Sequence, residues 1–421
     1  MDQLRIEGGL PLKGSVQVGG AKNAALPLLF TSLLTEGWME FKRVPKLADV
    51  EFSLSVLGHL GVEIQSDLTR HEVKLCAKNM NHLVAPYDLV RKMRASVLVL
   101  GPILARYGKA KVSLPGGCAI GARPIDIHLK GLEAMGASIQ LEEGYVIAEC
   151  SRLQGADFDL GFPSVGATEN LMMAATLGKG ETRLRNCARE PEIVNLAEAL
   201  VRMGALIEGA GTDEILIQGQ ESLRGTDIEV IGDRIQAGTY LVAGYATGGD
   251  VEVTGIHPSA LGAVLNLFEE AGASISKTEN SIRVRSSGER SKATQVVTSP
   301  FPGFPTDMQA QWMALMSLAD GESRIVETIF ENRFMHVSEL RRLGATIQIQ
   351  GNTAVVKGLT ALKGAPVMAT DLRASASLII AGLCAEGITH VRRLYHLDRG
   401  YESIEKQLQT LGANVERIEQ D

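Results

Sequence analysis

Six segments of one type recur along the chain, and each joins a helical pattern to an alternating one. Between residues 336 and 350 (HVSELRRLGATIQIQ), Val337, Leu340 and Leu343 have the spacing of one helix face, and beyond Gly344 apolar and polar residues alternate as in a strand. This pattern predicts a helix, a glycine at its C-terminal end and a strand. It recurs about every 68 residues, around Gly61, Gly136, Gly204, Gly272, Gly344 and Gly412.

Each repeat also contains a second helical stretch that is rich in alanine and more apolar. In residues 370–387 (TDLRASASLIIAGLCAEG), apolar residues occupy nearly every side of the expected helix. Helices of this kind belong inside a domain. We therefore predict a repeating unit of strand, buried helix, strand, amphipathic helix and strand pair, in which the sheets lie outside and enclose the helices.

The length of the chain and the number of repeats together predict two domains. A chain of 421 residues exceeds what one hydrophobic core usually serves, and three repeats suit a domain of ordinary size. The fold class is α/β, with two inside-out domains of three repeats each. We expect an N-terminal domain of residues 22–231, a C-terminal domain of residues 1–21 plus 232–421, and the active site in the cleft between them. The crossing segment is RGTDIEVIGDR (224–234), and a second crossing lies near residue 20.

Composition and charge exclude several classes of function. The formal net charge is −7, and the Lys/Arg stripe with interleaved aromatic residues that nucleic-acid binding requires is missing. The first residues, MDQLRIEGGLPLKGSVQVGG, do not resemble a signal peptide, and no apolar run approaches the roughly 18 residues of a membrane span. We expect a soluble, cytoplasmic protein that binds neither nucleic acid nor membrane.

Four cysteines stand in apolar, periodic stretches without CxxC pairs or other close spacings. This usage is typical of a reducing compartment, where cysteines are inert residues of the core. We predict that role for Cys76, Cys150, Cys187 and Cys384.

The first turns of the buried helices carry unusual polar residues. They are Lys22 and Asn23, Arg94, Thr168 and Glu169, Asp233 and Arg234, Asp307, and Arg373. Helix N-termini expose N–H groups and about half a positive charge, so starts that carry Lys or Arg can form an anion site. Each cation taken alone is also compatible with an ordinary surface charge, and an acid such as Asp307 stabilises a helix start unaided. Their recurrence at matching positions favours a bound anion.

The fifth cysteine, Cys118, lies among glycines in PGGCAIGARP (115–124), ahead of Arg123. A disulfide is not expected in a reducing compartment, zinc would need further Cys or His residues at ligand spacing, and a structural thiol belongs in an apolar periodic stretch. A chemical role is favoured, because a nearby arginine lowers the pKa of a thiol and increases its thiolate fraction. The glycines also suit a lid that closes over a ligand.

Motifs along the full length resemble the enolpyruvyl transferase family, in particular the UDP-N-acetylglucosamine 1-carboxyvinyltransferases. The resemblance rests on GAKNAALP (20–27), MRAS (93–96), PGGCAIGARPIDIHLKG (115–131), SVGATEN (164–170), DRIQAGT (233–239), FPTDMQAQ (304–311), ETIFENRFMH (327–336), ATDLRASASL (369–378) and HLDRGYE (396–402). It implies transfer of the enolpyruvyl group of phosphoenolpyruvate to the sugar 3-hydroxyl, the first committed step of peptidoglycan synthesis. It also implies a fold of two inside-out domains.

The resemblance also implies roles for individual residues. Cys118 corresponds to the proton donor, which can form a phospholactoyl adduct and is alkylated by fosfomycin, and Asp307 to the base near the sugar hydroxyl. Lys22 and Arg399 complete the catalytic set. Phosphoenolpyruvate contacts are implied for Lys22, Asn23, Arg123, Arg373 and Arg399. Nucleotide-sugar contacts are implied for Arg94, Arg123, Pro124, Ile125, Asp126, Ile127, Ser164, Val165, Gly166, Asp307 and Ile329. Some relatives have Lys where this chain has Phe162, which puts one diphosphate contact in doubt.

This chemistry needs an acid and a base at separate positions and cations to hold the departing phosphate. We expect no cofactor and no metal, and the oligomeric state does not follow from the sequence. We also expect the two anionic substrates to drive domain closure. Two alternatives remain. One is the sister transferase that acts on shikimate 3-phosphate, which lacks the Cys loop, and the other is a non-catalytic paralogue that binds the nucleotide sugar.

Overall fold

The computed structural model describes residues 2–91, 93–114 and 125–418. The described residues divide into two compact units, one built from residues up to Gly19 and from Gly232 onward, and the other from residues between Gly20 and Ile231. We call them the C-terminal and the N-terminal unit. Each has its own hydrophobic core. In the described part of the chain, no helix combines the length and the apolar character that crossing a membrane requires.

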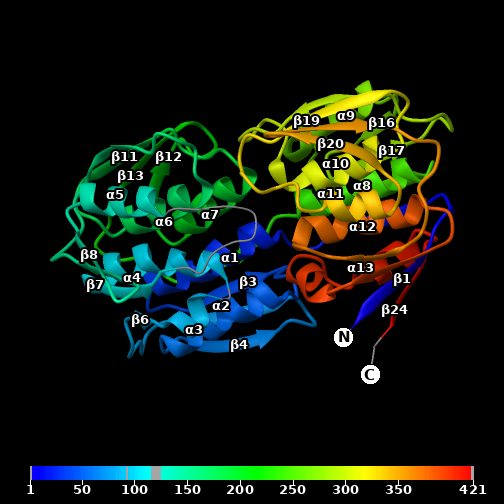
Figure 1. Ribbon diagram of the computed structural model, residues 1–421. Coiled ribbons are helices and arrows are strands. Elements are labelled where there is room, and N and C mark those ends of the chain that lie inside the picture. Colours follow the sequence, from blue (N-terminus) through cyan, green and yellow to red (C-terminus); the bar gives the residue numbers. More distant parts are fainter. Residues whose placement is uncertain (1, 92, 115–124, 419–421) are drawn as a thin grey trace. The chain divides into compact units, whose positions relative to one another are not determined.

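The N-terminal unit contains three repeats, drawn from blue to green in Figure 1. Its strands are β3 (Met39–Lys42), β4 (Glu63–Asp67), β5 (Glu72–Cys76), β6 (Val84–Ala85), β7 (Lys109–Ser113), β8 (Ser138–Glu142), β9 (Tyr145–Glu149), β10 (Asp157–Asp159), β11 (Glu181–Arg185), β12 (Leu206–Glu208), β13 (Glu214–Gln218) and β14 (Asp227–Glu229). Its helices are α1 (Lys22–Phe30), α2 (Ala48–His59), α3 (Tyr87–Val90), α4 (Leu100–Tyr107), α5 (Asp126–Ala134), α6 (Val165–Ala175) and α7 (Pro191–Arg202), with 3-10 helices η1 (Thr31–Leu34) and η2 (Arg94–Val99).

The C-terminal unit contains the other three repeats. Its strands are β1 (Gln3–Glu7), β2 (Lys13–Gln17), β15 (Asp250–Thr254), β16 (Ser274–Lys277), β17 (Ser281–Arg285), β18 (Gln295–Val297), β19 (Glu322–Val326), β20 (Thr346–Gln350), β21 (Thr353–Lys357), β22 (Pro366–Met368), β23 (Ile388–Arg392) and β24 (Asn414–Ile418). Its helices are α8 (Arg234–Ala246), α9 (Gly262–Glu270), α10 (Gln309–Met316), α11 (Val337–Arg342), α12 (Leu372–Cys384) and α13 (Ile404–Thr410), with 3-10 helices η3 (Pro258–Leu261), η4 (Thr306–Met308) and η5 (Leu394–Arg399).

The predicted order of elements within a repeat is confirmed. In the third repeat, β10 runs parallel to β11, and β11, β13 and β12 then pair antiparallel, with α6 and α7 as the two helices. All eight residues of α10 are buried, as expected for an enclosed helix. Six four-stranded sheets of the same type result.

Three sheets are completed by strands that are distant in sequence, and in one of them β2 pairs in parallel with β15 of the C-terminal unit. In the N-terminal unit, β14 pairs in parallel with β3, although about 190 residues separate them in the chain. In the C-terminal unit, β1 lies between β23 and β24 and pairs antiparallel with both. The N-terminal unit is thus completed by a strand from the end of its chain segment, and the C-terminal unit by strands β1 and β2 from the first residues of the chain.

The six repeat glycines confirm the predicted helix ends. They have positive φ angles: 92° at Gly61, 89° at Gly136, 107° at Gly204, 95° at Gly272, 96° at Gly344 and 91° at Gly412. A side chain at such an angle is strained, because Cβ approaches the backbone too closely. Glycine therefore lets each amphipathic helix reverse sharply into the following strand.

We predict that Gly344→Ala lowers the free energy of unfolding of the C-terminal unit by about 1 kcal/mol, through backbone strain alone. No atom lies within 4 Å of the added Cβ, so steric crowding contributes nothing. Urea unfolding followed by Trp312 fluorescence in a Trp38→Phe background measures this unit specifically, because Trp312 lies in its core and the chain has 2 tryptophans.

Gly262→Ala is the matched control. Its Cβ also meets nothing within 4 Å, but its φ is −47°, an ordinary helical value. This variant should be at least as stable as the parent protein. Equal losses in the two variants would contradict the account.

Candidate active site

The strongest charged arrangement in the C-terminal unit surrounds the carboxylate of Asp307, in η4. Its Oδ1 lies 2.8 Å from a guanidinium nitrogen of Arg333, and its Oδ2 lies 2.8 Å from one of Arg373. Burial alone would raise the pKa of Asp307, but the charges and hydrogen bonds of Arg373 and Arg333 hold it well below its usual value. Asp307 is therefore ionised at neutral pH.

Arg373 has donor capacity left over. It lies in the first turn of α12 and its side chain is only 6% exposed. Its Nη1 is buried and has no hydrogen-bond partner in the described part of the protein. An unpaired buried donor is costly, so this nitrogen favours an anionic ligand.

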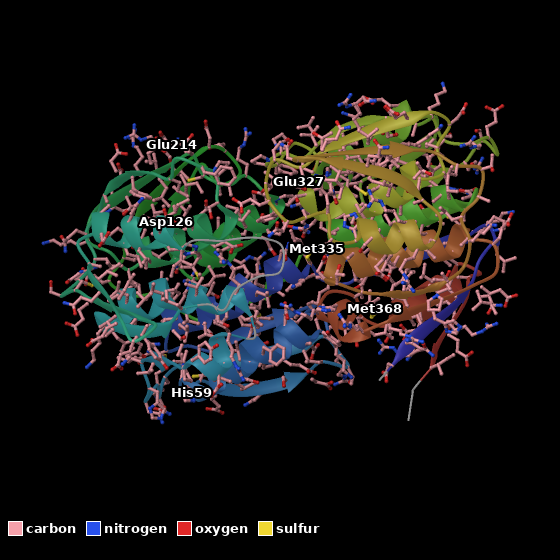
Figure 2. The ribbon with its side chains drawn as sticks, viewed as in Figure 1. His59, Asp126, Glu214, Glu327, Met335 and Met368 are labelled. Carbon is pink, nitrogen blue, oxygen red and sulfur yellow. The ribbon has the colours of Figure 1, made fainter. Side chains whose placement is uncertain are left out.

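A buried carboxylate, that of Glu327 (labelled in Figure 2), organises the loop after β19. Its Oε1 accepts hydrogen bonds from the backbone N–H groups of Ile329 (2.8 Å) and Phe330 (3.1 Å). Its Oε2 accepts a bond from the hydroxyl of Thr306, the residue before Asp307 (2.8 Å). Glu327 thus couples the Ile329 loop to the segment that carries Asp307. Because the Ile329 N–H is already used, its carbonyl is the backbone group that remains to contact a ligand.

Arg399 is the last residue of η5 and is partly buried. Burial lowers the pKa of its neighbour His396, and the charges of Arg399 and Arg393 lower it further. His396 is therefore mainly neutral at pH 7.

Three of the helix starts are capped by side chains of the protein itself. Asp233 caps α8 by accepting from Ile235 and Gln236, and Asp371 caps α12 by accepting from Arg373 and Ala374. The hydroxyl of Ser164 caps α6. Side chains thus replace a ligand at these ends. The starts of α1, η2 and η4 have no side-chain cap.

At the start of α1, in the N-terminal unit, Lys22 does not stand alone. Its Nζ lies 2.6 Å from Oδ2 of Asp49, a buried residue in the first turn of α2. This pair offsets the unfavourable position of a cation at a helix N-terminus. Asn23 follows in the same turn and is partly exposed.

Arg94 begins η2, a 3-10 helix, and lies close to a buried histidine that the sequence did not single out as a site residue. Burial, helped by the charge of Arg94 and opposed by that of Asp126, lowers the pKa of His128 to about 4. The Nδ1 of His128 accepts a hydrogen bond from the Nδ2 of Asn170 (3.0 Å), because an amide nitrogen can only donate. A Cβ at Gly166 would lie 3.5 Å from the His128 ring. Neutral His128 thus supports both Arg94 and the start of α6.

Thr168 and Glu169 do not lie in the first turn of their helix, contrary to expectation. Both are buried in the second turn of α6. The Thr168 hydroxyl donates to the carbonyl of Ser164 and accepts from the N–H of Ala188. Burial raises the pKa of Glu169 well above its usual value, and the charges of Glu192 and Glu190 add to this.

Three of the predicted site residues, Cys118, Arg123 and Pro124, lie outside the described residues. The Cys118 lid is therefore a prediction from sequence only. Next to this segment, Ile125 is buried, and Asp126 and Ile127 open α5; Figure 2 labels Asp126. Ser164 and Val165 lie at the start of α6, and the Phe162 side chain just before them is 46% exposed.

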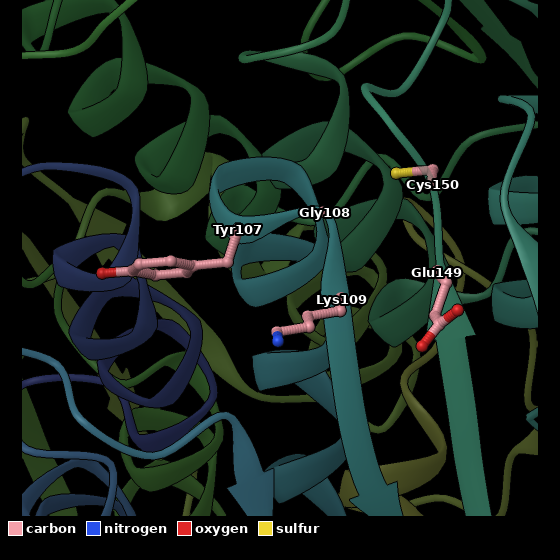
Figure 3. A pocket seen from close by; sticks show the side chains of 5 residues that line it. All are labelled: Tyr107, Gly108, Lys109, Glu149 and Cys150. Atoms are coloured by element: carbon pink, nitrogen blue, oxygen red, sulfur yellow. The ribbon is translucent and has the colours of Figure 1, made fainter.

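A surface hollow of about 590 Å³ in the N-terminal unit is lined by Tyr107, Gly108, Lys109, Glu149 and Cys150 (Figure 3). None of the five is a predicted site residue. Cys150 and Cys384 are partly buried, and Cys150 packs against the core of the N-terminal unit. Burial raises the pKa of both thiols, that of Cys384 to about 12, which disfavours the reactive thiolate. The hollow therefore offers no comparable chemistry.

Comparison with known proteins identifies the family. The family model "EPSP synthase (3-phosphoshikimate 1-carboxyvinyltransferase)" matches residues 6–408. The UDP-N-acetylglucosamine 1-carboxyvinyltransferase of Anaeromyxobacter dehalogenans (strain 2CP-C) is 57% identical over 421 residues, which is 99% of this chain and 100% of the relative. The chain belongs to the EPSP synthase family of enolpyruvyl transferases, in the branch of the UDP-N-acetylglucosamine 1-carboxyvinyltransferases.

Solved structures of this family share the fold. The enolpyruvyl transferase NikO from Streptomyces tendae superimposes with a TM-score of 0.88 at 24% identity, over 99% of this chain and 98% of that one. EPSP synthase from Acinetobacter baumannii gives a TM-score of 0.77 at 18% identity, over the full length of both chains. These likenesses confirm the predicted enolpyruvyl transferase fold.

In this enolpyruvyl transferase, sequence reasoning missed Arg333, Glu327, Asp49 and His128 as residues that support the site. In the sequence, these four residues lie inside the quoted motifs or between them, and no spacing pattern distinguishes them from their neighbours. Each acts through a partner at least 21 residues away, such as Thr306 for Glu327 or Asp307 for Arg333. No local pattern specifies such pairs.

We predict that Asp307→Asn lowers the stability of the C-terminal unit at pH 7 by about 2–3 kcal/mol, because it leaves two buried guanidiniums without their counter-ion. The folded pKa of Asp307 is depressed, so its stabilisation is present above the unfolded pKa of about 3.9 and is lost as pH falls through the folded value. The difference in unfolding free energy between Asp307→Asn and the parent protein should therefore decrease below about pH 4. Urea titrations at pH 7, 5 and 3.5, followed by Trp312 fluorescence, measure it.

Asp320→Asn is the control, since this carboxylate is 80% exposed and 3.7 Å from Arg290. Its effect should stay within about 0.5 kcal/mol at every pH. A deficit for Asp307→Asn that is constant down to pH 3.5 would refute the assignment.

Proposed function

We propose that the chain transfers the enolpyruvyl group of phosphoenolpyruvate to the 3-hydroxyl of UDP-N-acetylglucosamine and releases phosphate, a step of peptidoglycan synthesis. The observation that carries this proposal is the identity of 57% over the full length with a relative that bears this activity in its name. The ionised Asp307 and the unpaired nitrogen of Arg373 support it, because the reaction needs a base and a cation beside an anionic substrate.

The reaction has two stages, addition and elimination. In the first, the sugar oxygen bonds to C2 of phosphoenolpyruvate, its proton passes to a base, and the methylene carbon accepts a proton from an acid. In the second, the C–O bond to phosphate breaks, the methyl group returns a proton, and the enol ether is left. We assign the base to Asp307 and the acid to Cys118, the latter from its sequence motif alone.

A base held at a low pKa is a weak one, and the shared guanidinium offers a way to strengthen it. Arg373 pairs with Asp307, and its Nη1 has no hydrogen-bond partner among the described residues. A phosphoenolpyruvate anion that binds Arg373 competes for its charge, which weakens its hold on Asp307 and raises the pKa of that carboxylate. Asp307 would then become a better proton acceptor once the substrate is bound.

The remaining contacts are proposed from the family motifs. Lys22, Asn23, Arg123, Arg373 and Arg399 bind phosphoenolpyruvate and its departing phosphate. The nucleotide sugar contacts Arg94, Arg123, Pro124, Ile125, Asp126, Ile127, Ser164, Val165, Gly166, Asp307 and the carbonyl of Ile329. Two features support this set: the uncapped starts of α1 and η2, where Lys22 and Arg94 lie, and the loop that Glu327 fixes around Ile329.

Phosphate release tests the proposal directly. The protein with phosphoenolpyruvate and UDP-N-acetylglucosamine together should release phosphate, whereas either substrate alone should give none. Release with shikimate 3-phosphate in place of the nucleotide sugar would instead favour the activity in the name of the family model. Tight binding of the nucleotide sugar without any phosphate release would favour the non-catalytic alternative.

A further inference from the structure

A ring of contacts joins Asp307 to four other residues of the C-terminal unit. Tyr401, Thr239, Gln311, Asp307 and Arg373 are joined in that order, and Arg373 returns to Tyr401. The residues come from α8, α10, η4, α12 and the segment after η5. The ring therefore joins all three enclosed helices of the unit at the point where Asp307 is presented.

The direction of each hydrogen bond in the ring is fixed by chemistry. The Thr239 hydroxyl donates its one proton to the carbonyl of Ile235 (2.8 Å), so the Tyr401 hydroxyl must donate to Thr239 (2.8 Å). The Nε2 of Gln311 donates both to Thr239 (3.2 Å) and to the main-chain carbonyl of Asp307 (3.0 Å). The Tyr401 hydroxyl thus holds Thr239, and Thr239 holds the amide that fixes the backbone of Asp307.

The other side of the ring fixes the carboxylate of Asp307. Arg373 donates to Oδ2 at 2.8 Å, and the same guanidinium lies 5.9 Å from the centre of the Tyr401 ring, within cation–π range. Tyr401 is 1% exposed, so its position is set by packing. One tyrosine therefore restrains Asp307 through both its backbone and its ion-pair partner.

We propose that Tyr401 is a positioning residue, which acts through Thr239, Gln311 and Arg373 to hold Asp307 in the geometry that proton removal requires. The catalytic part of this inference rests on the proposed function. The restraint of Asp307 by the ring does not, because it arises from contacts within the protein. Nothing in the ring needs to contact a substrate except Asp307 and Arg373.

The test replaces only the hydroxyl, in Tyr401→Phe, and a second variant, Thr239→Val, breaks the ring at the next residue. Tyr240→Phe is the matched control. Tyr240 lies in α8 and is fully buried, and its hydroxyl has no hydrogen-bond partner among the described residues. The Tyr240→Phe variant therefore loses a buried hydroxyl but keeps every contact of the ring.

The first measurement needs no substrate. Proteins labelled at the aspartate carboxyl carbons are titrated by NMR, and the Asp307 signal is identified by its absence in Asp307→Asn. Other charges near the ring are Asp233, Asp371 and Arg333, and all three variants retain them. Loss of the Tyr401 hydroxyl or of Thr239 frees the backbone of Asp307, so its carboxylate pairs less well with the guanidiniums and should titrate about 1 pH unit higher in Tyr401→Phe and Thr239→Val than in the parent and in Tyr240→Phe.

The second measurement is the pH profile of kcat/KM for phosphate release. The acid limb should move to higher pH in the two ring variants only, and kcat should fall about tenfold or more. A variant that is merely less stable would lower the amount of active protein without moving the limb. Substrate ionisations are common to all the proteins and cancel in the comparison.

The outcomes separate the two proposals. Identical carboxyl titrations in Tyr401→Phe, Tyr240→Phe and the parent would overturn the positioning role, whether or not the parent protein releases phosphate. A shifted titration in both ring variants, with a parent that releases no phosphate, would support the restraint and overturn the proposed function.

Discussion

The carboxylate of Asp307 between two guanidiniums is the interaction on which the candidate site of the C-terminal unit depends. Arg333 and Arg373 each bind one of its oxygens at 2.8 Å, and both arginine side chains are 6% exposed. Three buried or half-buried charges would be unstable separately, since each would lose its hydration. Together they form a group with one excess positive charge, in which the two guanidiniums hold the pKa of Asp307 well below its usual value.

The rest of the unit is built to hold this group. Asp371 caps α12 and so fixes the turn that carries Arg373, while Glu327 ties Thr306, next to Asp307, to the Ile329 loop. In the N-terminal unit, Asp49 forms an ion pair with Lys22, as Asp307 does with Arg373. The distance between the charged atoms is 2.6 Å for Lys22–Asp49 and 2.8 Å for Arg373–Asp307. Both units thus hold a cation at a helix start by means of a buried carboxylate from another element, which keeps the cation in place before a substrate binds.

Much of the fold was predictable because its signals are local. Gly344 marks a helix end by its conformational freedom, and the apolar circumference of α12 marks an enclosed helix. The closing strands were not predictable in the same way, because the partner of β14 is β3, at the other end of the unit. The site residues divide in the same way into those with a local signal and those that depend on distant contacts. Asp307 and Lys22 could be named from helix position and motif, but the Tyr401 ring and the Glu327 loop depend on contacts between distant segments, which the sequence pattern does not encode.

The most direct test of the account is the comparison of catalysis with binding in Asp307→Asn. If this ionised carboxylate removes the proton from the sugar hydroxyl, kcat for phosphate release should fall by about 100-fold to 10,000-fold, while calorimetry with UDP-N-acetylglucosamine still shows binding. A variant that retains kcat within a few-fold of the parent value would contradict the central role assigned to Asp307.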